Sequence, residues 1–146
     1  ADEKNKTFFD VVYSYYPNAS KASYHAIKPL PFDTLVKQGL ALGFAKSSDK
    51  TIGLLACYEE TQGELTRKLS ENGASFFISL ANNQRFGDSK GLELVSMHAR
   101  LHSSENKRYL IRATNTGLTF VINPYGKKIA QLPPNQEGVL VADIFV

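Results

Sequence analysis

The single cysteine of the chain, Cys57, ends a nearly continuous apolar run and is followed at once by glutamates. The run 51–58 (TIGLLACY) is typical of a strand buried on both faces. Residues 59–72 are polar with Leu65 and Leu69 four positions apart, which predicts an amphipathic helix. A helix N-terminus favours a thiolate, and its free N–H groups can hold an oxyanion. The spacing therefore fits a nucleophile, although a lone cysteine in an apolar strand is more often a small buried hydrophobe.

The histidines and the charged residues point to no metal, cofactor or nucleic acid. His98 and His102 lie four residues apart in a predicted helix, but no carboxylate lies between them and no third ligand is evident. We therefore expect a pair on the helix surface. One cysteine excludes an internal disulfide and a cysteine-rich metal site. The formal net charge of +3 comes from scattered lysines rather than a basic stripe with aromatic residues, so no nucleic acid partner is expected.

The remaining pattern predicts the elements that would position Cys57. No apolar run reaches the roughly 18 residues of a membrane span. Alternating buried strands and crossover helices indicate an α/β fold in one domain, 1–146. The two helices leave much of the sheet uncovered. Strands are predicted over 7–16, 21–27, 51–58, 74–80, 109–113, 118–122, 128–131 and 139–146, helices over 59–72 and 88–106, a loop or short helix over 30–43, and turns at 17–20, 47–50 and 123–126.

Several segments resemble, in order, the motifs of a known family. Cys57-Tyr58-Glu59 matches the nucleophile motif of the carbon–nitrogen hydrolases of the nitrilase superfamily. The similarity begins near Phe9 and is greatest to the apolipoprotein N-acyltransferase branch. The other matching segments are ISLANNQRFGDS (78–89), RYLIRATNTG (108–117), VINPYG (121–126), AQLP (130–133) and GVL (138–140).

The resemblance implies a fold and a chemistry. The fold would be the C-terminal half of a nitrilase-type α-β-β-α sandwich, a mixed sheet with helices on one face, completed by a partner or a second copy. The family uses a Cys nucleophile, a Glu base and a Lys. Cys57 would form a thioester with a phospholipid acyl group and pass it to the N-terminal cysteine of a lipoprotein. Tyr58 N–H would hold the oxyanion, and Glu59 would be a supporting carboxylate or a charge that stabilises a helix N-terminus. The setting would be the periplasmic face of a bacterial inner membrane, with this chain itself expected to be soluble.

The sequence departs from the family at the lysine. The family pattern Y-x-K-x-H-L-V-P-F-G-E places Ala26 at the lysine and Thr34 at a glutamate. Lys28 lies two residues further along, about 7 Å on the same face of a strand, so it is the candidate lysine. The general-base Glu belongs to the first half of the family domain. Two hypotheses stay open: an acyl-transfer enzyme whose other half lies elsewhere, and a catalytically degenerate binding or assembly module.

Overall fold

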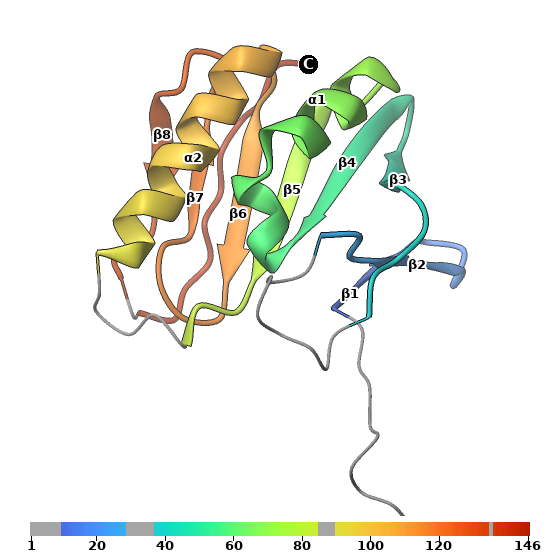
Figure 1. Ribbon diagram of the computed structural model, residues 1–146, viewed down its shortest axis with the longest axis horizontal. Coiled ribbons are helices and arrows are strands. Elements are labelled where there is room, and N and C mark those ends of the chain that lie inside the picture. The colour runs from blue at the N-terminus through green and yellow to red at the C-terminus, as the bar shows by residue number, and fades with distance from the viewer. Residues whose placement is uncertain (1–9, 29–36, 85–89, 135) are drawn as a thin grey trace, which may run out of the picture.

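The computed structural model describes residues 10–28, 37–84, 90–134 and 136–146. Within these residues the centre is a mixed sheet in the order β3-β4-β5-β6-β7-β8 (Figure 1). The middle strands β4, β5 and β6 run parallel, and the outer strands pair antiparallel. Parallel strands are buried on both faces, which explains their near-continuous apolar sequences. The bounds are β3 (Gly43–Ser47), β4 (Lys50–Ala56), β5 (Phe76–Ala81), β6 (Leu110–Thr114), β7 (Phe120–Ile122) and β8 (Lys128–Gln131).

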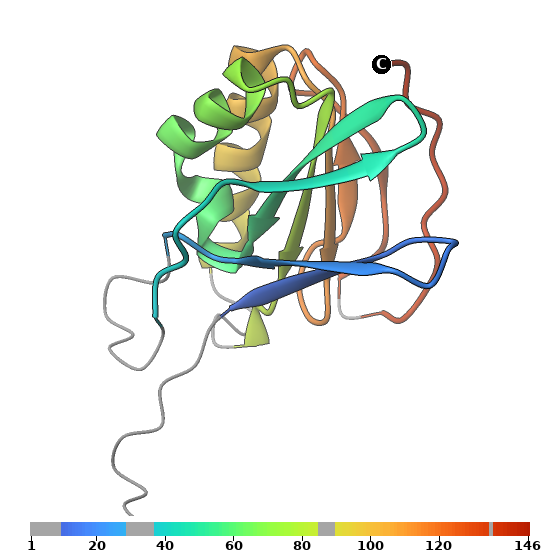
Figure 2. The same cartoon turned by 90° about the vertical axis from the view of Figure 1, so that its right-hand side faces the viewer.

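Two helices cover one face of this sheet. They are α1 (Gly63–Glu71) and α2 (Gly91–Asn106), and a short 3-10 helix, η2 (Cys57–Thr61), precedes α1. Figure 2 shows the sheet between these helices and the remaining elements. The amphipathic pattern of α1 points Leu65 and Leu69 into the core. That core consists of Leu55, Leu65, Leu69, Ala74, Phe77, Ala99, Leu110, Phe120 and Ile122.

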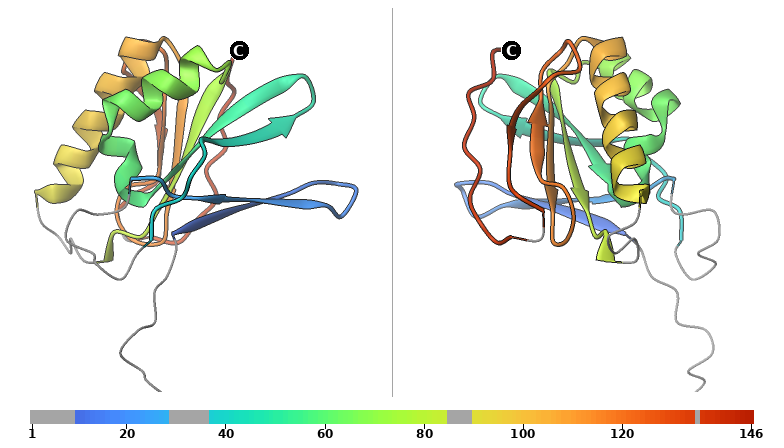
Figure 3. Two further views of the ribbon diagram at one scale, coloured as in Figure 1. Left: turned by 45° about the vertical axis from the view of Figure 1, so that its right-hand side comes forward. Right: turned by 90° about the vertical axis from the view of Figure 1, so that its left-hand side faces the viewer.

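The opposite face carries no helix among the described residues and is partly covered by a hairpin (Figure 3). Strands β1 (Val11–Tyr15) and β2 (Lys21–His25) form this separate antiparallel pair. Their side chains Val12 and Tyr24 join a second core with Ile52, Leu54 and Phe76. The C-terminal segment adds Ile144 to its edge. The architecture confirms the predicted α/β fold, a mixed sheet with helices on one face, as in half of a nitrilase-type sandwich.

Most predicted elements lie where the pattern placed them, and two expectations are wrong. The strand β3 was not predicted, because Gly43–Ser47 (GFAKS) lacks the β-branched run that marks a strand. Residues 139–146 were predicted as a strand but form no ladder in the described chain. Their apolar alternation has no neighbouring strand to pair with, so Val139, Val141 and Phe145 stay exposed. The predicted helix over 59–72 is divided into η2 and α1. None of the described helices is both long and apolar enough to cross a membrane.

Candidate functional site

Cys57 lies on a sharp turn between β4 and η2. Its φ angle is +52°, the left-handed region that residues other than glycine rarely adopt. Because β4 and β5 are parallel, their carboxyl ends meet at one edge of the sheet, and the segment after β5 lies beside the turn. Cys57 Sγ is 4.0 Å from the carbonyl oxygen of Asn82, the outer limit of a thiol hydrogen bond. The half-buried cysteine therefore occupies the predicted elbow.

The surroundings of Cys57 keep it in the thiol form. Burial raises the pKa of the thiol, and the negative charges of Asp10 and Glu60 raise it further. Hydrogen bonding to the backbone of Asn82 and of Tyr58 opposes this and lowers the pKa. The net pKa is above its ordinary value, so the expectation that a helix N-terminus would favour the thiolate is wrong. The reason is that Cys57 begins a five-residue 3-10 helix rather than a long α-helix, and burial outweighs its small dipole.

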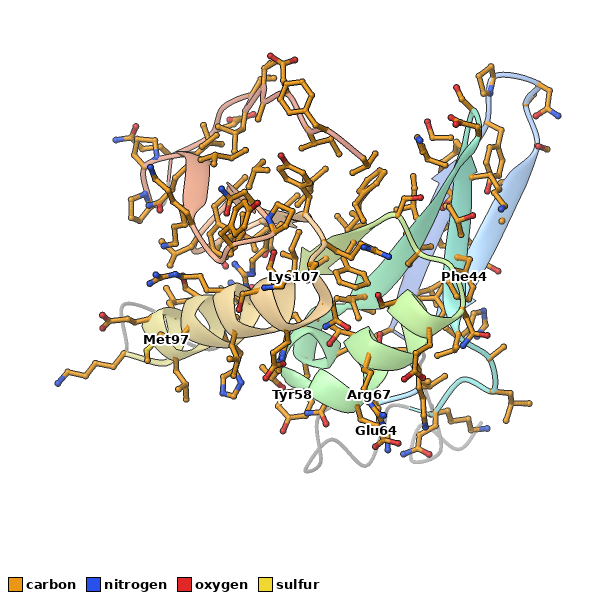
Figure 4. The ribbon with its side chains drawn as sticks, turned by 90° about the horizontal axis from the view of Figure 1, so that it is seen from above. Phe44, Tyr58, Glu64, Arg67, Met97 and Lys107 are labelled. Carbon is orange, nitrogen blue, oxygen red and sulfur yellow. The ribbon has the colours of Figure 1, made fainter. Side chains whose placement is uncertain are left out.

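Tyr58 is placed to act through its backbone. The effect of its backbone on the pKa of Cys57 puts that hydrogen-bonding group close to the sulfur. Seen from above, the Tyr58 side chain lies on the outer side of the helical layer with Glu64 and Arg67 of α1 (Figure 4). The position of the backbone is the one expected of an oxyanion donor.

Glu59 is fully buried (0% exposed) and is surrounded by donors. Tyr24 Oη donates to both carboxylate oxygens, at 2.8 and 2.9 Å. The backbone N–H groups of Ile27, Lys28 and Ala56 donate to the same carboxylate at 2.7, 3.0 and 2.8 Å. Glu59 thus ties the end of the β1–β2 hairpin to the end of β4. This is a carboxylate that supports the shape of the site, and its partners go beyond the charge of a helix N-terminus.

The hydroxyl of Tyr24 is part of the same support. Burial is the largest cause that raises its pKa, followed by the charge of Glu59 and their hydrogen bond. Tyr24 therefore stays protonated over the physiological range and remains a donor to Glu59.

The predicted lysine region adds no ammonium group at the sulfur. Ala26, which stands at the family lysine, is fully buried, and its N–H donates to the carbonyl oxygen of Asp10 at 2.8 Å. Lys28 is exposed, and its positive charge lowers the pKa of the exposed Glu64 on α1. No cation is among the causes that shift the pKa of Cys57. Lys28 as the catalytic lysine stays a prediction, and Thr34 lies outside the described residues.

A buried charge network lies directly beneath the elbow. Glu60, the third residue from Cys57, pairs with Arg112 of β6 at 2.7 and 2.8 Å. Ser79 of β5 donates to Glu60 at 2.8 Å, and Arg112 donates to Asn83 Oδ1 at 2.6 Å. All four residues are buried. Sequence reasoning missed this network, although a lone arginine in the apolar strand LIRAT was the available signal, since a buried charge requires a partner.

The histidine pair differs from the expected surface pair. His102 is buried (5% exposed), with Nδ1 3.2 Å from Glu105 and Nε2 without a hydrogen-bond partner in the described structure. Its ring packs under Gly63, where an added Cβ would lie 2.8 Å from Cε1. The prediction failed because helical spacing says which residues share a face but not what covers it. Among the described residues, no group of three or more His, Cys, Asp or Glu side chains could hold a metal ion.

Comparison with protein families agrees with this fold and site. Residues 10–145 match the model of the Carbon-nitrogen hydrolase family, and the chain belongs to that family. Among curated proteins, it is similar to the apolipoprotein N-acyltransferase of Pseudomonas paraeruginosa, with 30% identity over 116 residues, 79% of this chain and 22% of that protein. It is also similar to that of Agrobacterium fabrum, with 38% identity over 98 residues, 66% of this chain and 18% of that protein. The chain therefore spans less than a quarter of either relative.

Solved structures show the same fold at lower identity. A carbon–nitrogen hydrolase from Helicobacter pylori G27 superposes with a TM-score of 0.81 at 15% identity, over 95% of this chain and 57% of that one. An amidase from Nesterenkonia sp. superposes with a TM-score of 0.79 at 18% identity, over 92% of this chain and 54% of that one. The chain thus corresponds to about half of each solved domain.

Proposed function

We propose that this chain carries the nucleophile of a nitrilase-fold acyl-transfer enzyme similar to apolipoprotein N-acyltransferase. The observation that supports it most is the backbone of Cys57, which turns through φ +52° at the end of a parallel strand and exposes the sulfur beside Asn82. Such a turn stores strain that a structural cysteine does not need, and strained turns are typical of nucleophile positions.

In this proposal the reaction proceeds through a thioester in two steps. Cys57 Sγ attacks a phospholipid ester, a C–S bond forms as the C–O bond breaks, and the thiol proton goes to the leaving alcohol. The α-amine of a lipoprotein N-terminal cysteine then attacks the thioester, a C–N bond replaces the C–S bond, and a proton returns to sulfur. Tyr58 N–H stabilises the oxyanion in both steps. These substrates require the surface of a membrane, so we place the reaction at the periplasmic face of a bacterial inner membrane.

The base that takes the thiol proton is expected on a partner. The oxygens of Glu59 and Glu60 are occupied by donors, so neither carboxylate is placed for this task. We propose that the first half of the family domain, or a second copy of this chain, supplies a glutamate. That partner would pack on the sheet face opposite the helices, where Leu80 remains 39% exposed. Lys28 is the proposed ammonium in this chain.

One observation favours the degenerate alternative. Ala26 provides no ammonium where the family has lysine, and the pKa of Cys57 is raised rather than lowered. A binding or assembly module would keep the elbow and lose the chemistry. The two proposals differ in whether Cys57 ever carries an acyl group.

Intact mass spectrometry tests the proposal directly. The chain is incubated with a phospholipid of defined acyl length in mixed micelles, alone and together with a segment of a relative that carries the family glutamate. We expect a mass increase of one acyl group in the mixed sample, released by neutral hydroxylamine as a thioester should be. Because Cys57 is the sole cysteine, the hydroxylamine-sensitive site needs no further assignment.

Cys57→Ala serves as the control and should carry no acyl group. Cys57→Ser is the matched variant, and any ester on it should resist neutral hydroxylamine. A completed protein that stays unacylated, with Cys57 still reactive to acrylamide, would support the degenerate module instead. Acrylamide is a suitable probe because it adds to the active site cysteine of the Nesterenkonia sp. AN1 amidase.

A further inference from the structure

The buried network at Glu60 joins the two segments that meet at Cys57. Glu60 belongs to η2, which begins at Cys57, and Asn83 follows Asn82 in the segment after β5. Arg112 lies between them and donates to both, at 2.7 and 2.8 Å to Glu60 and 2.6 Å to Asn83. One guanidinium therefore sets the distance between the turn that holds the sulfur and the loop that faces it.

Arg112 is fixed on its other sides as well. Its side chain is 1% exposed and also donates to the carbonyl oxygen of Leu118 at 2.5 Å, and its guanidinium lies 5.5 Å from the centre of the Phe120 ring. Ser79 holds the second partner, since its hydroxyl donates to Glu60 at 2.8 Å. A planar guanidinium with its donors occupied in this way has a single orientation, which a lysine could not reproduce.

The loop that Arg112 holds contacts the sulfur. Cys57 Sγ lies 4.0 Å from the carbonyl oxygen of Asn82, and the backbone of Asn82 also lowers the pKa of the thiol. A hydrogen bond that favours a thiolate comes from a donor, so Asn82 offers backbone groups to both protonation states. The position of Asn82 depends on Asn83, whose amide is buried against Arg112.

We propose that Glu60, Arg112 and Asn83 are positioning residues for the nucleophile, and that they act by fixing the Asn82 backbone against the Cys57 sulfur. This inference rests on the proposed function, because it concerns the same thiol. It assigns a role in the acyl-transfer step to side chains that touch neither substrate nor sulfur. It also separates the adjacent glutamates, since Glu59 shapes the hairpin side of the elbow and Glu60 the side of β5 and β6.

The test is the pH profile of Cys57 alkylation by iodoacetamide, with one variant on each arm of the network. Asn83→Leu keeps the size of the side chain and the Glu60–Arg112 pair but releases the loop. Asn82 then no longer lowers the pKa of Cys57, so the midpoint of the profile moves up and the rate at pH 8 falls about threefold. Glu60→Gln removes a negative charge that raises the pKa, so the midpoint moves down and the rate at pH 8 rises about threefold.

The opposite directions distinguish positioning from a general loosening of the fold. The charges that bear on Cys57 are Asp10 and Glu60, and Arg112 faces the sulfur only through Glu60. A loosened fold would bring the midpoint toward that of a free thiol, and so downward, in both variants. Thr66→Val is the matched control, since Thr66 is fully buried on α1 with a hydroxyl that donates to Gly63 and has no contact with the network. It should lower the melting temperature and leave the midpoint in place.

Two further outcomes complete the test. If Glu60→Gln does not fold, the double variant E60Q/R112M removes both charges together and should move the midpoint up, as Asn83→Leu does. An unchanged midpoint in Asn83→Leu overturns the inference. That result leaves the proposed function intact if the wild-type chain still forms the acyl adduct, whereas loss of the adduct with a shifted midpoint counts against the proposed function alone.

Discussion

The two faces of the central sheet are closed to different degrees. On the helical face the side chains of β4, β5 and β6 meet α1 and α2, and Phe77 is completely buried. On the opposite face a two-stranded hairpin covers one end, and Leu80 of the same strand remains partly exposed. The contrast extends to the adjacent glutamates, since Glu60 faces a guanidinium and Glu59 faces neutral donors. The helical face is therefore a finished core, and the hairpin face is a surface built to receive more chain.

The largest effect should come from cutting into the finished face. We expect Phe77→Ala to reduce the free energy of unfolding by about 3–5 kcal/mol, because it leaves a cavity among well-packed neighbours. Leu80→Ala on the same strand should cost less than about 1 kcal/mol, since its side chain already contacts solvent. Urea denaturation of both variants measures the difference. Equal losses would mean that the hairpin face is as complete as the helical one.

A smaller effect should come from the donors around Glu59. Tyr24→Phe removes a hydroxyl that donates to a charged carboxylate, and we expect a loss of about 1.5–3 kcal/mol. Tyr16→Phe is the control, because its exposed hydroxyl accepts only a long bond from Lys46 N–H at 3.4 Å. The same denaturation curves give both values. A loss for Tyr24→Phe no greater than for the control would show that the backbone donors alone hold Glu59.

The smallest change in stability, and the most informative for chemistry, should follow from Ala26→Lys. An ammonium group near the sulfur favours the thiolate, so the pKa of Cys57 should fall and the alkylation midpoint should move to lower pH. One pKa unit would raise the thiolate fraction about tenfold near neutral pH. Ala26→Met fills the same space without charge and should leave the midpoint unchanged. If both variants shift it equally, the effect is steric and the family lysine position does not face Cys57.

The sequence predicted the elements better than their partners. The apolar runs of β4 and β5, the leucine spacing of α1 and the cysteine elbow all follow from local pattern, and the structure has each of them. The pairing of Glu60 with Arg112, 52 positions away, did not follow, because nothing local identifies which buried charge meets which. His102 was expected on the surface for the same reason, since the contact with Gly63 arises only when α1 and α2 pack together.

The hydrogen bonds of Glu59 also have a consequence for the order in which the chain folds. Tyr24, Ile27 and Lys28 precede Glu59 by 35, 32 and 31 positions. During synthesis the hairpin leaves the ribosome first, and until Glu59 follows, its donors have only water as a partner. Closing a loop of this length also carries an entropy cost that the hairpin alone does not offset. The β1–β2 hairpin should therefore reach its docked position late, after β4 has formed, and a truncated chain that ends before Glu59 should leave it undocked.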